Sequence, residues 1–306
     1  MKKILISIFC TLFFSYLSYS QSTDASRIAQ DGKLDDWTIL EIKESSVIGG
    51  NTKNLYKLSG NNIFAPCNIM AQVMGIVKVS NTLFPEARNN GYCVRMVNAI
   101  ESIKVFGFIN LDVMVQGTLL TGVFEEPVKD SQNTYATVDC GVPYTGHPKA
   151  LEYDYKAISG NEILRSTGFS AQKKLGIPDY PCVKVLLQRR EEHPDGSVTA
   201  QRVGTGFKLF KESTSDWVNG DRTPIRYGDL SSDSELKGFG MGLKRGKDAF
   251  YCRNSAGKLV PIEEVGWADE GTEPTHLIIW ISSSSGEAFH GGPGNTLWVD
   301  NIKLIE

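Results

Sequence analysis

The chain has 306 residues, a formal net charge of -3 at pH 7 and 41% hydrophobic residues. This length is enough for one large domain or two ordinary ones. The mild acidity provides no electrostatic footprint for nucleic acid, so nucleic acid is excluded as a predicted partner.

The N-terminus has the three parts of a secretory signal peptide. Lys2 and Lys3 precede the apolar or small residues 4–17, and residues 18–20 (Ser-Tyr-Ser) supply the small residues of a cleavage site. The apolar part is shorter than the roughly 20 residues of a membrane span. The sequence therefore predicts a signal peptide over residues 1–20, cleaved between Ser20 and Gln21, with an uncleaved membrane anchor as the alternative.

The predicted signal peptide indicates that the mature chain works outside the cytoplasm. It is expected in the periplasm, at the cell surface or in the medium. No later segment is apolar enough over sufficient length to span a membrane, so no transmembrane span is expected in the mature chain.

Five cysteines stay in the mature chain when Cys10 is removed with the signal. Because five is odd, at least one thiol is free or pairs with another chain. None forms a C-x-x-C pair, so zinc and thioredoxin-like sites have no support. The spacing selects no disulfide pair among Cys67, Cys93, Cys140, Cys182 and Cys252.

Residues 21–30 are polar and are predicted to form a short flexible lead before one domain over residues 31–306. That domain contains short runs of β-branched and aromatic residues separated by Gly, Asn, Asp and Pro. Such runs predict an all-β, antiparallel β-sandwich. A hairpin turn is expected at His193-Pro194-Asp195-Gly196. The predicted strands are residues 106–116, 151–157, 183–190, 206–212, 276–282 and 296–305.

Two predicted strands place carboxylates on defined faces. In residues 151–157, period two puts Glu152 and Asp154 opposite Leu151 and Tyr153. Paired carboxylates are typical of glycoside hydrolysis, although a solvated strand face explains this pair more simply.

In the last strand, strict alternation puts Asp300 on the core face with Ile302 and Leu304. An inward carboxylate needs a partner, because burying an unpaired charge costs several kcal/mol. If the first and last strands are neighbours, Asp35 and Asp300 are candidate ligands of a structural Ca²⁺ ion. The alternative is that Asp300 accepts hydrogen bonds from backbone N–H groups at a strand end.

The sequence resembles the putative carbohydrate metabolism domain family of secreted Bacteroidetes proteins. The resemblance is strongest over residues 141–306, where residues 141–156 (GVPYTGHPKALEYDYK) and the closing LWVDNIKL of residues 297–304 match family patterns. Residues 31–37 (DGKLDDW) are similar to the opening of jelly-roll carbohydrate-binding modules. His290 departs from the family, in which an acidic residue is frequent at that position.

The resemblance implies a jelly-roll β-sandwich and a glycan-related role at the cell envelope. A polysaccharide or oligosaccharide is the expected partner, together with other envelope proteins. The family has no agreed catalytic motif, so no catalytic residue is assigned. The leading hypothesis is a carbohydrate-binding module; the alternatives are a glycan-active hydrolase or lyase and a structural or adhesive envelope protein.

Aromatic residues in polar stretches are the candidate ligand-binding residues, because sugar rings stack their C–H faces on aromatic rings. Aromatic residues within apolar strands are expected to be buried instead. The candidates are Trp217, Tyr227, Tyr251 and Trp267.

Overall fold

The computed structural model describes residues 23–73, 75–105, 109–128, 134–168 and 170–306. The predicted signal peptide and its cleavage site lie outside these residues.

The predicted flexible lead is helical over residues 25–30. Helix α1 (Ala25–Asp31) begins after Asp24, whose side chain accepts a hydrogen bond from the amide of Arg27 at 2.8 Å. Ile28 is fully buried in the main core. Because so short a helix is marginal alone, its packing against the sandwich stabilises it.

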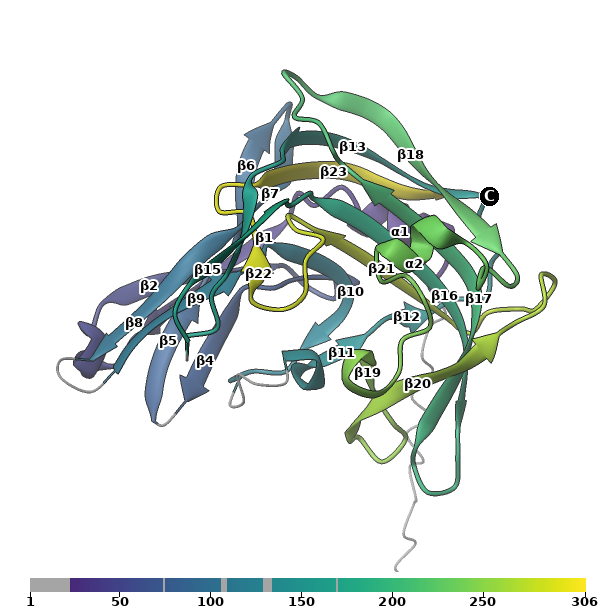
Figure 1. Ribbon diagram of the computed structural model, residues 1–306, viewed down its shortest axis with the longest axis horizontal. Coiled ribbons are helices and arrows are strands. Elements are labelled where there is room, and N and C mark those ends of the chain that lie inside the picture. Colours follow the sequence, from purple (N-terminus) through teal and green to yellow (C-terminus); the bar gives the residue numbers. More distant parts are fainter. Residues whose placement is uncertain (1–22, 74, 106–108, 129–133, 169) are drawn as a thin grey trace, which may run out of the picture.

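Most strands join one fourteen-stranded sheet that curves back on itself, so that two layers face each other (Figure 1). The described pairs of named strands are antiparallel apart from β17 with β20, which confirms the expected all-β, antiparallel sandwich. One layer contains β10 (Thr118–Phe124), β21 (His276–Ser282), β16 (Cys182–Glu192) and β17 (Val198–Leu209). The other contains β18 (Val218–Tyr227), β13 (Ala150–Ile158), β23 (Thr296–Ile305), β7 (Gly91–Val97) and β6 (Leu83–Arg88).

Three hairpins extend to one side of the sandwich, at the left of Figure 1. They are β1 (Trp37–Lys43) with β2 (Thr52–Leu58), β4 (Ile69–Val73) with β5 (Ile76–Ser80), and β8 (Ala99–Val105) with β9 (Ile109–Val115).

The remaining elements are short or lie at the edges of the sandwich. They are η1 (Ser46–Ile48), β3 (Phe64–Pro66), η2 (Thr134–Thr137), β11 (Val138–Cys140), β12 (Val142–Pro143), β14 (Glu162–Arg165), β15 (Lys173–Pro178), α2 (Ser234–Gly238), η3 (Gly246–Asp248), β19 (Tyr251–Arg253), β20 (Leu259–Trp267) and β22 (His290–Gly291).

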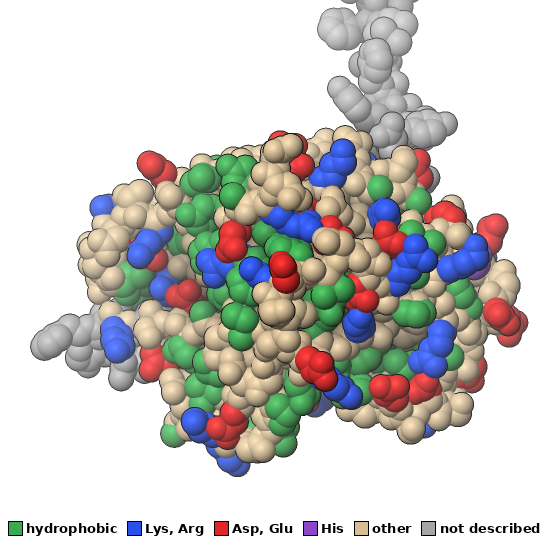
Figure 2. Space-filling view, turned by 90° about the horizontal axis from the view of Figure 1, so that it is seen from above, with side chains coloured by type: hydrophobic (Ala, Val, Ile, Leu, Met, Phe, Trp, Pro, Cys, Tyr) green, Lys and Arg blue, Asp and Glu red, His purple; other side chains and the backbone are tan. Residues whose placement is uncertain are grey.

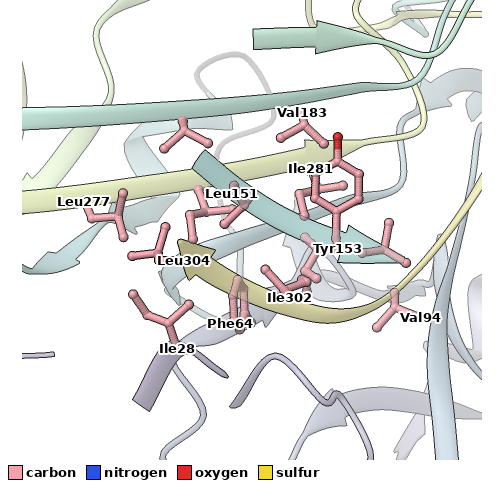
Figure 3. Packing of buried hydrophobic residues seen from close by; sticks show 14 of the residues in the cluster. Ile28, Phe64, Val94, Leu151, Tyr153, Val183, Leu277, Ile281, Ile302 and Leu304 are labelled. Carbon is pink, nitrogen blue, oxygen red and sulfur yellow. The ribbon is translucent and has the colours of Figure 1, made fainter. Parts of the chain in front are cut away.

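The main core lies between the two layers (Figure 3). Leu151 and Tyr153 of β13 meet Val183 of β16 and Ile281 of β21, and all four are completely buried. Each such aliphatic side chain contributes about 1.5–3 kcal/mol by leaving water. The alternation predicted for residues 151–157 is therefore confirmed, and it turns the side chain of Asp154 away from this core.

A β-bulge interrupts the alternation of β23. Between the cross-strand pairs Glu152–Lys303 and Asp154–Asp300, β13 advances by two residues and β23 by three. Asn301 has a φ of 52°, in the left-handed region that Asn tolerates better than most residues. The extra residue reverses which face the following side chains occupy.

The bulge corrects the predicted direction of Asp300. Core positions in β23 are Leu297 and Val299 before the bulge, and Ile302 and Leu304 after it. Asp300 therefore lies on the outer face, and the prediction that it shares the face of Ile302 was wrong. The expectation of burial was correct, since Asp300 is only 6% exposed.

Candidate functional site

The outer face of the layer that contains β13 and β23 carries a dense mixture of charges. Figure 2 views the molecule from the side on which β13, β18 and β23 lie, and it shows Lys and Arg side chains interleaved with Asp and Glu. On this face Glu152 forms ion pairs with Arg222 at 2.7 Å and with Lys303 at 2.8 Å. The ammonium of Lys156 lies 4.3 Å from the ring centroid of Trp298.

Trp217 stands at the edge of this face, immediately before β18. Its indole ring is half-buried, and the guanidinium carbon of Arg88 lies 3.8 Å from the ring centroid. Stacking of this kind contributes about 0.5–2 kcal/mol and fixes the plane of the ring. The predicted exposure of Trp217 is thus partial, and one side of the ring rests on a cation.

Arg88 connects three parts of the chain beneath Trp217. Its Nη2 donates to Asp154 at 2.9 Å and to Oδ1 of Asn219 at 2.7 Å, and its Nη1 donates to Asp300. Asn301 donates its side-chain amide to Asp154 at 2.8 Å. The side chains of Arg88, Asp154 and Asp300 are 9%, 14% and 8% exposed, so water screens these ion pairs weakly.

The two carboxylates have pKa values moved in opposite directions. Burial disfavours the charge of Asp154, but hydrogen bonds from Asn301, the Gly220 amide and Arg88 hold its pKa below the ordinary value. Burial raises the pKa of Asp300, and the hydrogen bond from Arg88 offsets only part of that rise.

Trp267 forms a second aromatic site at the end of β20. The guanidinium carbon of Arg202 lies 5.5 Å from its ring centroid. Arg202 is fully buried and makes a bidentate ion pair with Glu264, whose Oε1 also accepts from Gln188 at 2.6 Å. A cleft of about 230 Å³ has Trp267 in its lining.

The two tyrosines predicted as ligand-binding residues are half-buried. The hydroxyl of Tyr227 donates to the carbonyl of Pro148 at 2.7 Å, and its ring centroid lies 5.4 Å from that of His147. These contacts give Tyr227 a structural role. Tyr251 belongs to β19, whereas Trp217 immediately precedes β18 and Tyr227 is its last residue, so the four aromatic candidates do not form one site.

The predicted Ca²⁺ ligands have other partners in the structure. Oδ1 of Asp35 accepts from the amide of Tyr92 at 2.9 Å, whereas Asp300 binds Arg88. Within the described residues no group of three or more His, Cys, Asp or Glu side chains could hold a metal ion. Arg88 supplies the positive charge next to Asp300 that we expected a Ca²⁺ ion to supply. The Ca²⁺ ion shared by Asp35 and Asp300 stays a prediction.

Arg88, Asn219 and Asn301 were not among the predicted site residues. No local signal marks Arg88, because its contact with Asp300 spans 212 positions of sequence. Asn219 could have been suggested by its position two residues from Trp217, and Asn301 by its position beside Asp300.

The chain is similar to two crystal structures described as putative glycoside hydrolases, from Bacteroides thetaiotaomicron and Bacteroides vulgatus. The first is 17% identical with a TM-score of 0.46, over 88% of this chain and 70% of the other. The second is 13% identical with a TM-score of 0.47, over 88% of this chain and 95% of the other.

No sequence match was found among curated proteins. In the described part of the chain, no helix has the length and apolar character needed to cross a membrane. The model of one family, the putative carbohydrate metabolism domain, matches residues 35–305, and the chain therefore belongs to that family.

Proposed function

We propose that the mature chain is an exported protein that binds a polysaccharide or oligosaccharide through the outer face around Trp217. The observation that carries this proposal is the half-buried Trp217 ring held on Arg88 among polar side chains. The carbohydrate-related family supports it independently.

The chemistry of this face suits a sugar. A pyranose presents an apolar C–H face, which stacks on an indole ring. Its hydroxyl groups form hydrogen bonds with charged or amide side chains. Arg222, whose side chain is 58% exposed, can donate to such hydroxyls from the same face. Because Arg88 fixes Trp217 before any ligand arrives, binding loses little conformational entropy at the ring.

At the cell envelope such a protein would hold glycan close to partner enzymes. A glycan array probed with the mature chain, residues 21–306, tests this function directly. Selective binding to one class of glycan is expected, whereas a silent array with folded protein would contradict the proposal.

A glycan-active enzyme is the second candidate function. It is favoured by the adjacent pair Asp154 and Asp300, whose pKa values move apart as those of an acid and a base do. Hydrolysis or lyase activity on a polysaccharide panel, lost in Asp154→Asn, would establish it. Asp154 and Asp300 both form ion pairs with Arg88. For this reason we prefer the glycan-binding function to the enzymatic one.

A further inference from the structure

The cleft beside Trp267 is separate from the outer face around Trp217. Its walls come from the end of β20 and from the chain around α2, residues 230–245. Leu236 and Met241 supply buried apolar surface, and Trp267 supplies an aromatic side. At about 230 Å³ the cleft is smaller than the roughly 300–1,000 Å³ of sites for drug-sized ligands, so it suits a single sugar ring.

The aromatic side of this cleft is held by buried ion pairing. Arg202 lies against Trp267 and binds both oxygens of Glu264, whose Oε2 also accepts from the Lys244 amide at 2.6 Å. A guanidinium fixed by two hydrogen bonds cannot move without losing them. Trp267 is therefore positioned in advance, as a recognition site requires.

The charges that line the cleft have one sign. Lys237 and Arg245 line it and no carboxylate does. Within the described residues neither cation has an Asp or Glu oxygen within 4.0 Å, although the carboxylate of Glu263 accepts from the amide of Gly246, the residue after Arg245, at 3.0 Å. Asp229, which lies near Lys237, has its carboxylate turned to the amide of Ser231 at 2.7 Å. On a chain with a net charge of -3, two unpaired cations around one apolar cleft indicate an anionic ligand.

The chain next to the cleft carries charges of both signs, because Lys244 lies near Lys184 and Arg202 and also near Asp248 and Glu264. Burial, together with the charges of Lys184 and Arg202, lowers the pKa of Lys244 to about 8.

We propose that the Trp267 cleft binds one ring of an acidic glycan, a sugar that carries a carboxylate. The ring stacks on Trp267, and its carboxylate is bound by Lys237 and Arg245. This inference rests on the proposed carbohydrate-binding function and names a ligand class for a second site.

The test uses matched pairs of glycans and calorimetry on the mature chain. Oligomers of galacturonic, glucuronic, mannuronic and guluronic acid are each compared with the carboxyl-reduced oligomer, which differs only in the lost charge. At least one acidic oligomer should bind about tenfold more tightly than its neutral counterpart. K237A/R245A should remove that difference, and Trp267→Ala should weaken both members of the pair.

A control variant removes the same charge elsewhere. Lys173 and Lys174 are exposed on β15, and K173A/K174A should retain the full preference for the acidic oligomer. The proposal is overturned if no acidic oligomer binds more tightly than its neutral counterpart, or if the preference survives K237A/R245A. Neither result would affect the binding of neutral glycans that depends on Trp217. The proposal for the Trp267 cleft can therefore fail while the proposal for Trp217 holds.

Discussion

The guanidinium of Arg88 lies under the indole of Trp217, 3.8 Å from the ring centroid, and the same guanidinium binds Asp154 and Asp300. One arginine at the end of β6 thus joins β13 and β23 to the segment that begins β18. The orientation of Trp217 depends on this ion pairing. The contribution of each carboxylate to stability can be measured by substituting Asp154 and Asp300 separately.

Asp154→Asn and Asp300→Asn should differ in stability at pH 7 although both are isosteric. The pKa of Asp154 is lowered in the folded protein, so its charge stabilises the fold, and its loss should cost about 2 kcal/mol. The pKa of Asp300 is raised, so its charge opposes folding, and the cost should be about 1 kcal/mol or less. Urea denaturation gives both free energies of unfolding; equal losses would contradict this assignment.

The deficit of Asp154→Asn should also depend on pH. A carboxylate with a lowered folded pKa contributes its full stability above the unfolded value of about 3.9. That contribution disappears as pH falls through the folded pKa, because protonated Asp154 resembles Asn. The melting temperatures of the wild-type and variant proteins should therefore begin to converge as pH falls below about 4, and a constant gap would refute the ion-pair account.

Glu264→Gln should be among the most damaging single changes. It leaves the charge of fully buried Arg202 uncompensated, which costs about 3–5 kcal/mol. The double variant R202M/E264L should lose much less, because it removes both charges and keeps an apolar interior. Chemical denaturation of the three proteins measures this difference, and a double variant no more stable than Glu264→Gln would argue against it.

The predicted shared calcium ion is tested by thermal melting. Excess Ca²⁺ at 100 times its dissociation constant stabilises a folded protein by about 2.7 kcal/mol. If Asp35 and Asp300 bind the ion together, Ca²⁺ should raise the melting temperature of the wild type and not that of Asp35→Asn. An unchanged wild-type melting temperature would leave Arg88 as the counter-ion of Asp300.

Export is tested by expressing the full chain in a Gram-negative host and isolating it from outside the cytoplasm. Mass spectrometry of the purified protein should give Gln21 as the first residue, because Ser18 and Ser20 are the small residues of the predicted cleavage site. Recovery of an intact chain in the membrane fraction would instead support the N-terminal anchor.

Local sequence signals predicted the strands better than the site. Strands β21 and β23 have the predicted bounds, because β-branched runs between turn residues are a local pattern. The predicted turn at residues 193–196 lies between β16 and β17, where the amide of His193 donates to the carbonyl of Ser197 at 2.9 Å.

The site depends on features that such patterns do not contain. A single residue in the left-handed conformation, Asn301, moved Asp300 to the other face, and strict alternation cannot anticipate a bulge. The partner of Asp300 comes from β6, 212 positions away, so it follows only from the order of strands in the sheet. Helix α1 is polar at most positions, and its contacts with the core, rather than its own propensity, form it.

The central claim is that Trp217 binds sugar, and calorimetry with a glycan identified on the array measures this most directly. Trp217→Ala should weaken binding at least tenfold and leave the protein folded with a modestly lower melting temperature, because the ring is outside the core and its stacking on Arg88 contributes only about 0.5–2 kcal/mol. Tyr92→Ala, which removes a 47% exposed aromatic ring from β7, opposite Ala87 and next to the Arg88–Gly91 pair, should bind normally. Wild-type affinity in folded Trp217→Ala would contradict the account.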